Sequence, residues 1–369
     1  AAYAQSFGYD FKNGNTCKTF LEHLSTKYEM KDMKPLYGRA NIDLAPCRAT
    51  KKSVRVIHFS VEAAIRSLLT STLKDNPSNI VVNPNDPFSK YVPADPDEVG
   101  EVLGGDAYQK NYERFIPQDP DQNYLIFPII FYTDSTQTDR FGNFHVHPFL
   151  LSSSFFSIQV RSLYCGWRLI GLIPDIYVGL SKSDRKKINN KPGGTGYTIR
   201  NLHSILHVIL QEYIQIQKNG GIFFESLTIN GVTKQNVLVI CPLQMVTGDQ
   251  EGNDKLAGKG GHHAHISRAC HCPYKDSANT TYKCQWKTKA QMMAITQNAG
   301  GTFQDQLNAC KAFSQIPVDN VFWKIEFLDD VHSIHGGTPL CLLPLMLQGI
   351  FLNVSESHIN PLSDDGRNV

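Results

Sequence analysis

Apolar residues along the chain occur in short continuous runs and in runs with helical spacing. The run from Tyr124 to Tyr132 is aromatic and β-branched, and it stops at the polar residues Thr133 and Asp134. Because it is too short to span a membrane, it predicts a buried strand that carries Asp134 at its exposed end. A polar turn over residues 139–143 leads into a second predicted strand, 144–151. We expect the two to form a hairpin at the centre of a sheet.

The same reading extends along the rest of the chain. Further strands are predicted over residues 167–174, 223–229 and 235–246. Helices are predicted over residues 60–73, 107–115 and 201–218, and the last has the clearest apolar stripe. The order of three strands, a helix and further strands predicts an α/β fold, a mixed sheet flanked by helices.

Composition divides the chain into four regions. We expect an accessory region over residues 1–105 that ends in a proline-rich connector, and a core over residues 106–255. Residues 256–320 form a predicted insertion that contains histidine and cysteine. Residues 321–369 are expected to be an incomplete C-terminal part of the core or of the insertion.

Charge and hydropathy exclude some classes of protein. The 369 residues carry a net charge of +2 and are 41% apolar, so no overall basic field indicates nucleic acid and wholesale disorder is excluded. No apolar run of about 18 residues predicts a membrane span, and the first residues lack the features of a secretory signal. We therefore expect a soluble, intracellular protein that contacts any nucleic acid through local patches. The scattered cysteines indicate reduced thiols and one metal site.

Two aspartates are the first candidates for chemistry. Asp134 and Asp249 each follow an apolar predicted strand. If these strands are neighbours, the carboxylates converge on one or two divalent ions, Mg²⁺ or Mn²⁺, that support attack on a phosphodiester. The alternatives are that Asp134 caps a turn and that Asp249 belongs to an acidic surface turn.

A second candidate lies downstream, where histidines and cysteines cluster. Thiolates and imidazoles within about 25 residues bind Zn²⁺ tetrahedrally, and such a site would stabilise an insertion that lacks a core of its own. The spacing does not include a clean C-x₂-C pair, so a polar loop with incidental ligands is the alternative. The predicted structural zinc ligands are His265, Cys270, Cys272 and Cys284.

The chain resembles transposases of the Plavaka type, within the CACTA (EnSpm) group. The resemblance covers about residues 105–352 and depends on the order and spacing of several motifs. These are Phe131 to Thr136 with Gly142 and Pro148, Trp167 to Pro174, Gly248 to Gly258, Arg268 to Pro273, and His335 to Pro339.

This resemblance implies a ribonuclease-H-like core with a DDE/D metal site and a zinc-knuckle-like insertion. Asp134 matches the first acid and Asp249 the second, and the implied activity frees a DNA 3′ end and joins it to target DNA. The implied location is the nucleus, and self-association into a homo-oligomer is left open. Basic residues near the core are expected to contact DNA phosphates: Lys182, Arg185, Lys186, Lys187, Lys255, Lys259 and Arg268.

The chain departs from the family pattern at several positions. Ser267 and Pro344 stand where a cysteine and a histidine are usual. No third acid is identified, although Glu326, Asp329, Asp330 and Glu356 are candidates. The alternatives are therefore an inactive, transposase-derived DNA-binding protein with a structural zinc site, and a different metal-dependent nuclease on the same fold. A fragment or decayed copy would fit these departures.

Overall fold

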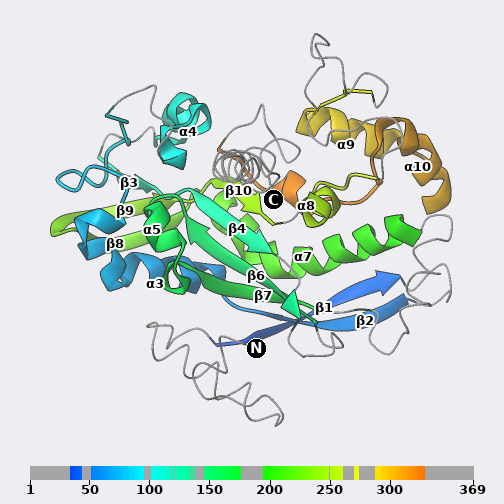
Figure 1. Ribbon diagram of the computed structural model, residues 1–369, viewed down its shortest axis with the longest axis horizontal. Coiled ribbons are helices and arrows are strands. Elements are labelled where there is room, and N and C mark those ends of the chain that lie inside the picture. Colours follow the sequence, from blue (N-terminus) through cyan, green and yellow to red (C-terminus); the bar gives the residue numbers. More distant parts are fainter. Residues whose placement is uncertain are drawn as a thin grey trace, which may run out of the picture.

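The fold combines two β-sheets with helices on their flanks. The computed structural model describes residues 34–43, 51–94, 101–117, 119, 121–133, 136–137, 145–174, 176, 194–248, 250–260, 270–273 and 287–328. Within these ranges a large sheet and a three-stranded sheet are each mixed in strand direction, and helices pack around them (Figure 1). The predicted mixed α/β architecture is confirmed.

The larger sheet contains the predicted central hairpin. Its strands lie in the order β1 (Leu36–Asp43), β2 (Lys51–His58), β7 (Arg168–Ile173), β6 (His145–Ser153), β4 (Ile129–Thr133) and β10 (Leu243–Thr247), with the short β5 (Thr136–Gln137) beside β6. Neighbours from β1 to β4 are antiparallel, whereas β10 runs parallel to β4. The region expected to be accessory thus contributes β1 and β2 to this sheet.

The smaller sheet corrects two of the predicted strands. It consists of β3 (Asn123–Ile126), β9 (Val232–Ile240) and β8 (Ile222–Ile229), in that order. The strand predicted over 124–132 is therefore two strands, β3 and β4, and that over 235–246 contains most of β9 and of β10.

Two segments of the chain pass from one sheet to the other, each at a proline. Pro128 separates β3 from β4, and Pro242 separates β9 from β10. Proline has no N–H to donate to a ladder, which favours a break in the strand at these points. The carbonyl group of Pro242 accepts from the Ile129 N–H at 2.8 Å, so the two crossings remain side by side.

Helix α7 (Gly194–Lys218) contains the helix predicted over 201–218 and begins earlier. It packs on one face of the large sheet, where Tyr213 meets Phe131 of β4 with ring centroids 5.1 Å apart. A Cβ on Gly171 of β7 would lie 2.8 Å from the Ile209 side chain, so glycine permits this close approach. Helix α3 (Val61–Thr70) confirms the prediction over 60–73, with Ser60 as its N-cap.

Shorter helices complete the described fold. They are α4 (Asp106–Asn111), α5 (Ile158–Arg161), α8 (Gln250–Leu256), α9 (Lys289–Asn298) and α10 (Phe303–Cys310), with 3₁₀ turns at 72–75, 77–79, 102–104, 112–115, 164–166, 311–313 and 321–324. The predicted helix over 107–115 is thus α4 followed by a 3₁₀ turn. Among the helices of the described ranges, none combines the length and the apolar character that crossing a membrane requires.

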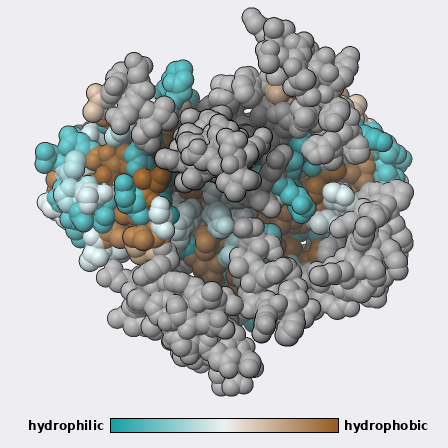
Figure 2. Space-filling view, in the orientation of Figure 1, coloured by the Kyte–Doolittle hydropathy of each residue, from teal (hydrophilic) through white to brown (hydrophobic). Residues whose placement is uncertain are grey.

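The surface mixes apolar and polar residues. Figure 2 shows hydrophobic residues among hydrophilic ones at the left of the view, the end of the molecule that carries β8, β9 and α3. Phe223 of β8 is one exposed aromatic residue, and Arg66 of α3 donates to its carbonyl oxygen. Scattered exposed apolar residues of this kind are ordinary on soluble proteins.

Candidate functional site

The predicted acid residues follow two strands that are hydrogen-bonded neighbours. Val246 of β10 lies opposite Phe131 of β4, and Thr247 lies opposite Tyr132. The Thr247 hydroxyl group donates to the Phe131 carbonyl group at 3.3 Å. Both strands run in the same direction, so their carboxyl ends meet at one edge of the sheet.

The last described residues of this strand pair are in close contact. A Cβ placed on Gly248 would lie 2.6 Å from the Thr133 carbonyl oxygen, which leaves no room for a side chain. Asp134 and Asp249 are the next residues after Thr133 and Gly248, and both lie outside the described residues. The sequence therefore attaches the two predicted acids to backbone positions that touch.

Helix α8 adds a buried amide at this edge. Asn253 is 1% exposed, and its Nδ2 donates to the Gly248 carbonyl group at 3.0 Å. Its Oδ1 lies 3.3 Å from the position that a Cβ on Gly248 would occupy. Neither this Oδ1 nor the buried Oγ1 of Thr133 has a hydrogen-bond partner in the structure.

Buried oxygens without partners are uncommon and call for an explanation. Leaving such an oxygen without a partner costs about 1–3 kcal/mol. A bound cation, which interacts with the oxygen lone pair, would therefore be stabilising. The atoms that could coordinate a metal here are oxygens, the type of ligand atom that Mg²⁺ and Mn²⁺ prefer. This chemistry fits the divalent ion that the sequence predicts.

Sequence analysis did not identify Asn253. It follows Asp249 by four residues inside a polar stretch interpreted as a turn, and nothing in the pattern marks it as buried. The one available signal was its spacing from Asp249, which suits one turn of a short helix.

A buried histidine connects α8 to α7 and to the segment that follows α10. Nδ1 of His203 accepts from the Val321 N–H at 3.4 Å, and Nε2 lies 3.2 Å from the Lys255 carbonyl oxygen. Burial lowers the pKa of His203 to about 3, so the ring is neutral at pH 7. Since Nδ1 accepts, the proton belongs on Nε2, which donates to Lys255. The ring thereby stabilises the end of α8.

One turn along α7, the His207 side chain is hydrogen-bonded to Asp319. Its Nε2 lies 3.2 Å from the carboxylate, and Lys324 approaches the same oxygen at 2.8 Å. The hydrogen bond from His207 is the largest influence that lowers the pKa of Asp319, against the effect of burial. This pair attaches the segment before Val321 to α7.

The described lysines of the predicted DNA contacts differ in exposure. Lys255 forms an ion pair with Glu251 at 2.7 Å and has 37% of its side chain exposed. Lys259 has 2% of its side chain exposed and approaches Asp254 at 3.1 Å. Lys255 is therefore available at the surface, whereas the Lys259 ammonium group lies inside. The other predicted contacts lie outside the described residues: Lys182, Arg185, Lys186, Lys187 and Arg268.

Half of the predicted zinc ligands are described. Cys270 and Cys272 are partly exposed and form no disulfide bond with another described cysteine, and Cys284 and His265 lie outside the described residues. In the part of the chain that the structure describes, no three or more His, Cys, Asp or Glu residues form a group able to hold a metal. Lys287 interacts electrostatically with Cys270, and burial lowers the pKa of this lysine to about 8.

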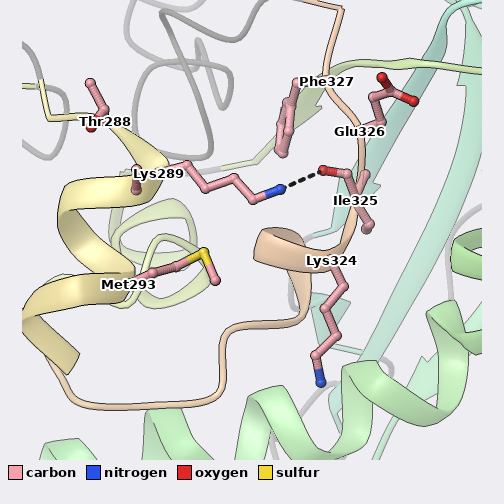
Figure 3. Close-up of a pocket in the computed structure, with 8 residues that line it drawn as sticks. Thr288, Lys289, Met293, Lys324, Ile325, Glu326 and Phe327 are labelled. Atoms are coloured by element: carbon pink, nitrogen blue, oxygen red, sulfur yellow. Dashed lines mark hydrogen bonds between the residues drawn. The ribbon is translucent and has the colours of Figure 1, made fainter. Parts of the chain in front are cut away.

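A cavity of about 550 Å³ lies away from the acid edge, between the start of α9 and residues 324–327. Figure 3 shows Lys289 extended toward the Ile325 carbonyl group, a contact of 3.4 Å. The neighbouring Glu326 carbonyl group accepts from the Leu243 N–H at 3.0 Å. Leu243 begins β10, four residues from Thr247, so the backbone of Glu326 lies about 13 Å from the acid edge.

Comparison with protein families gives a match over most of the chain. The profile described as Plavaka transposase matches residues 11–337, which include every described strand and helix. No curated protein gives a match to the chain. Since the profile covers more than half of the sequence, the chain belongs to the Plavaka transposase family.

Proposed function

We propose that this chain is a DNA transposase that cleaves phosphodiester bonds and transfers DNA strands at a metal site built on Asp134 and Asp249. The observation that carries the proposal is the contact between Thr133 and Gly248, the residues that precede the two acids. Consecutive Cα atoms are 3.8 Å apart and neighbouring strands about 4.8 Å apart. Two carboxylates attached there are within reach of shared divalent ions.

The proposed fold of this core is ribonuclease-H-like. Three antiparallel strands, β4, β6 and β7, precede helix α7, and β10 then returns parallel to β4. This connection places the carboxyl end of the first strand beside that of the last. The family membership of the chain supports the same assignment. The wider CACTA grouping is part of the proposal.

The divalent ions, when bound, would activate a water or a DNA 3′-hydroxyl group and stabilise the leaving 3′-oxygen. The protein contributes rigid positions for the ligands. Phe131 and Tyr213 pack the strand against α7, and Asn253 of α8 fixes the backbone of Gly248 by a hydrogen bond. Asn253 also supplies an uncommitted oxygen, Oδ1. Such preorganisation keeps charged ligands in place without reorganisation during the reaction.

The partner is DNA, at transposon ends and at target sites, and the place of action is the nucleus. The transposase family supports the partner. Among the described basic residues, Lys255 lies on the same short helix, α8, as Asn253 and would contact a phosphate. The basic stretch that contains Lys182, Arg185, Lys186 and Lys187 would add phosphate contacts that weaken with salt.

A structural Zn²⁺ held by Cys270, Cys272, Cys284 and His265 is the second proposed metal. The soft sulfur donors of Cys270 and Cys272 suit zinc. Metal analysis of the purified chain should give one zinc per molecule, and chelation should lower its melting temperature. A zinc-free chain with a melting temperature insensitive to chelators would reject this site.

Cleavage of DNA tests the proposed reaction. The purified chain with Mn²⁺ should nick duplexes that carry the ends of its own element, and Asp134→Asn should abolish nicking. Nicking that is equal on duplexes without these ends would favour a general nuclease. Binding of DNA without nicking by the wild-type chain would favour the inactive, DNA-binding alternative.

A further inference from the structure

An exposed face of the β1–β2 ribbon carries two arginines, neither of which forms an ion pair with another described residue. Along β1 the buried positions Ala40 and Ile42 alternate with exposed ones. We call the exposed side the ribbon face; it consists of Tyr37, Arg39, Asn41, Ser53 and Arg55. Gly38, on the other side of β1, faces Val208 of α7, so the ribbon face points away from that helix.

The two arginines on this face lie directly opposite each other. Arg39 and Arg55 are partners in the antiparallel ladder between β1 and β2. Like charges at opposed positions destabilise a sheet, and no acidic side chain of the described residues neutralises either guanidinium group. An arrangement that costs stability in the free protein is explained most simply by an anionic ligand.

The aromatic residue beside them completes a surface for stacking. The Arg55 guanidinium carbon lies 3.8 Å from the centroid of the Tyr37 ring, and Tyr37 is 56% exposed. Stacking holds the planar guanidinium group in one orientation while its N–H groups remain available to phosphate oxygens. Asn41 and Ser53, which are also opposite each other, add polar hydrogen-bonding groups.

The ladders place the ribbon face at the same end of the sheet as the acids. Ile57 lies opposite Leu172, so Arg55 is level with the residue that follows Ile173. Ile173 lies opposite His147, and Thr133 lies opposite Phe149. Measured along the strands, Arg55 is thus about 10 Å beyond Thr133, in the direction of the acid edge. Measured across the sheet, β2 is three strand spacings, about 14 Å, from β4.

We propose that the ribbon face binds the phosphate backbone of the DNA duplex whose cleaved bond lies at the acid edge. A duplex rises about 3.4 Å per base pair, so about five base pairs cover the distance between the two places. Arg39 and Arg55 would each contact a phosphate, which positions the duplex without reading its sequence. This inference rests on the proposed function, because that function supplies the DNA.

Fluorescence anisotropy with a labelled duplex of about two helical turns tests the proposal. The full chain is used without added Mg²⁺ or Mn²⁺, so that neither ion occupies the acid edge and any structural zinc is retained. Arg39→Ala with Arg55→Ala should raise the Kd at least tenfold and reduce the slope of log K against log salt by about 1.8. Arg39→Lys with Arg55→Lys keeps both charges and should restore most of the slope.

Arg66→Ala is the matched control, because this arginine of α3 is already paired with Glu62 and lies over the Phe224 ring. It should change neither the Kd nor the slope. Equal binding by the wild-type chain and the double alanine variant would overturn the ribbon-face proposal and leave the proposed function intact. A wild-type chain that does not bind DNA at all would overturn both.

Discussion

The Thr247 hydroxyl group donates to the carbonyl group of Phe131 at 3.3 Å, across the parallel pair of β10 and β4. This bond lies two residues before Asp249 and three before Asp134. It fixes the register of the two strands, in which the residues before Asp134 and Asp249 lie at the same level. The account of the metal site depends on this register, because a shift of one residue would turn one carboxylate to the opposite face.

Gly248→Ala tests the contact between the strand ends. The added methyl group would lie 2.6 Å from the Thr133 carbonyl oxygen, a backbone atom that cannot rotate away. We expect a loss of about 1–3 kcal/mol in the free energy of unfolding, measured with urea, and a loss of Mn²⁺ affinity. Gly300→Ala is the control, since no atom lies within 4 Å of its added Cβ. Equal stability of the two variants would refute the contact.

Asn253 is predicted to have two separable roles. Asn253→Ala removes the hydrogen bond to Gly248 and the uncommitted Oδ1, so it should lower both stability, by about 1–3 kcal/mol, and Mn²⁺ affinity. Asn253→Asp removes the N–H donor but keeps an oxygen, so it should lower stability and retain Mn²⁺ binding. Unfolding and calorimetry report the two roles independently. Loss of Mn²⁺ binding in both variants to the same extent would assign Asn253 a structural role alone.

The buried His203 should make stability fall on mild acidification. Its pKa is about 3 in the folded chain and about 6.5 when unfolded, so below pH 6.5 the unfolded state binds a proton that the folded state does not. The resulting loss between pH 7 and pH 5 is about 2 kcal/mol. The amide of the His203→Gln variant can still donate to Lys255 but does not ionise. Between pH 7 and pH 5 this variant should therefore lose about 2 kcal/mol less stability than the wild-type chain.

Unfolding curves at both pH values check this expectation. Asp319 does not interfere, because its lowered pKa acts below its ordinary value near 3.8. His58 also has a lowered pKa, chiefly from burial, but it contributes equally to wild type and variant. Parallel losses of stability in the two proteins would show that His203 is not buried and neutral as described.

Local patterns predicted the elements that a single segment determines. The apolar stripe of Ile205, Leu206 and Ile209 gave helix α7, and the strand 167–174 and its hairpin partners followed from apolar runs. The passage of β3 into β4 was not predicted, because residues on both sides of Pro128 are equally apolar. Only the pairing of Pro242 with Ile129 in three dimensions shows why the chain changes sheet there.

The candidate site could be predicted only in part, because some of its features depend on contacts between distant segments. A carboxylate after a buried strand is visible in sequence, so Asp134 and Asp249 could be selected. The burial of Asn253 and the opposition of Arg39 to Arg55 depend on tertiary packing and ladder register. Residues 39–42 do alternate between polar and apolar types, a signal that could have indicated β1.

Calorimetric titration with Mn²⁺ tests the central claim most directly. The wild-type chain is compared with the Asp134→Asn, Asp249→Asn double variant, whose folding is confirmed by its melting temperature. If the ends of β4 and β10 form one metal site, the wild-type chain binds Mn²⁺ and the variant does not. Identical titration curves for the two folded proteins would contradict a shared metal site at this edge of the sheet.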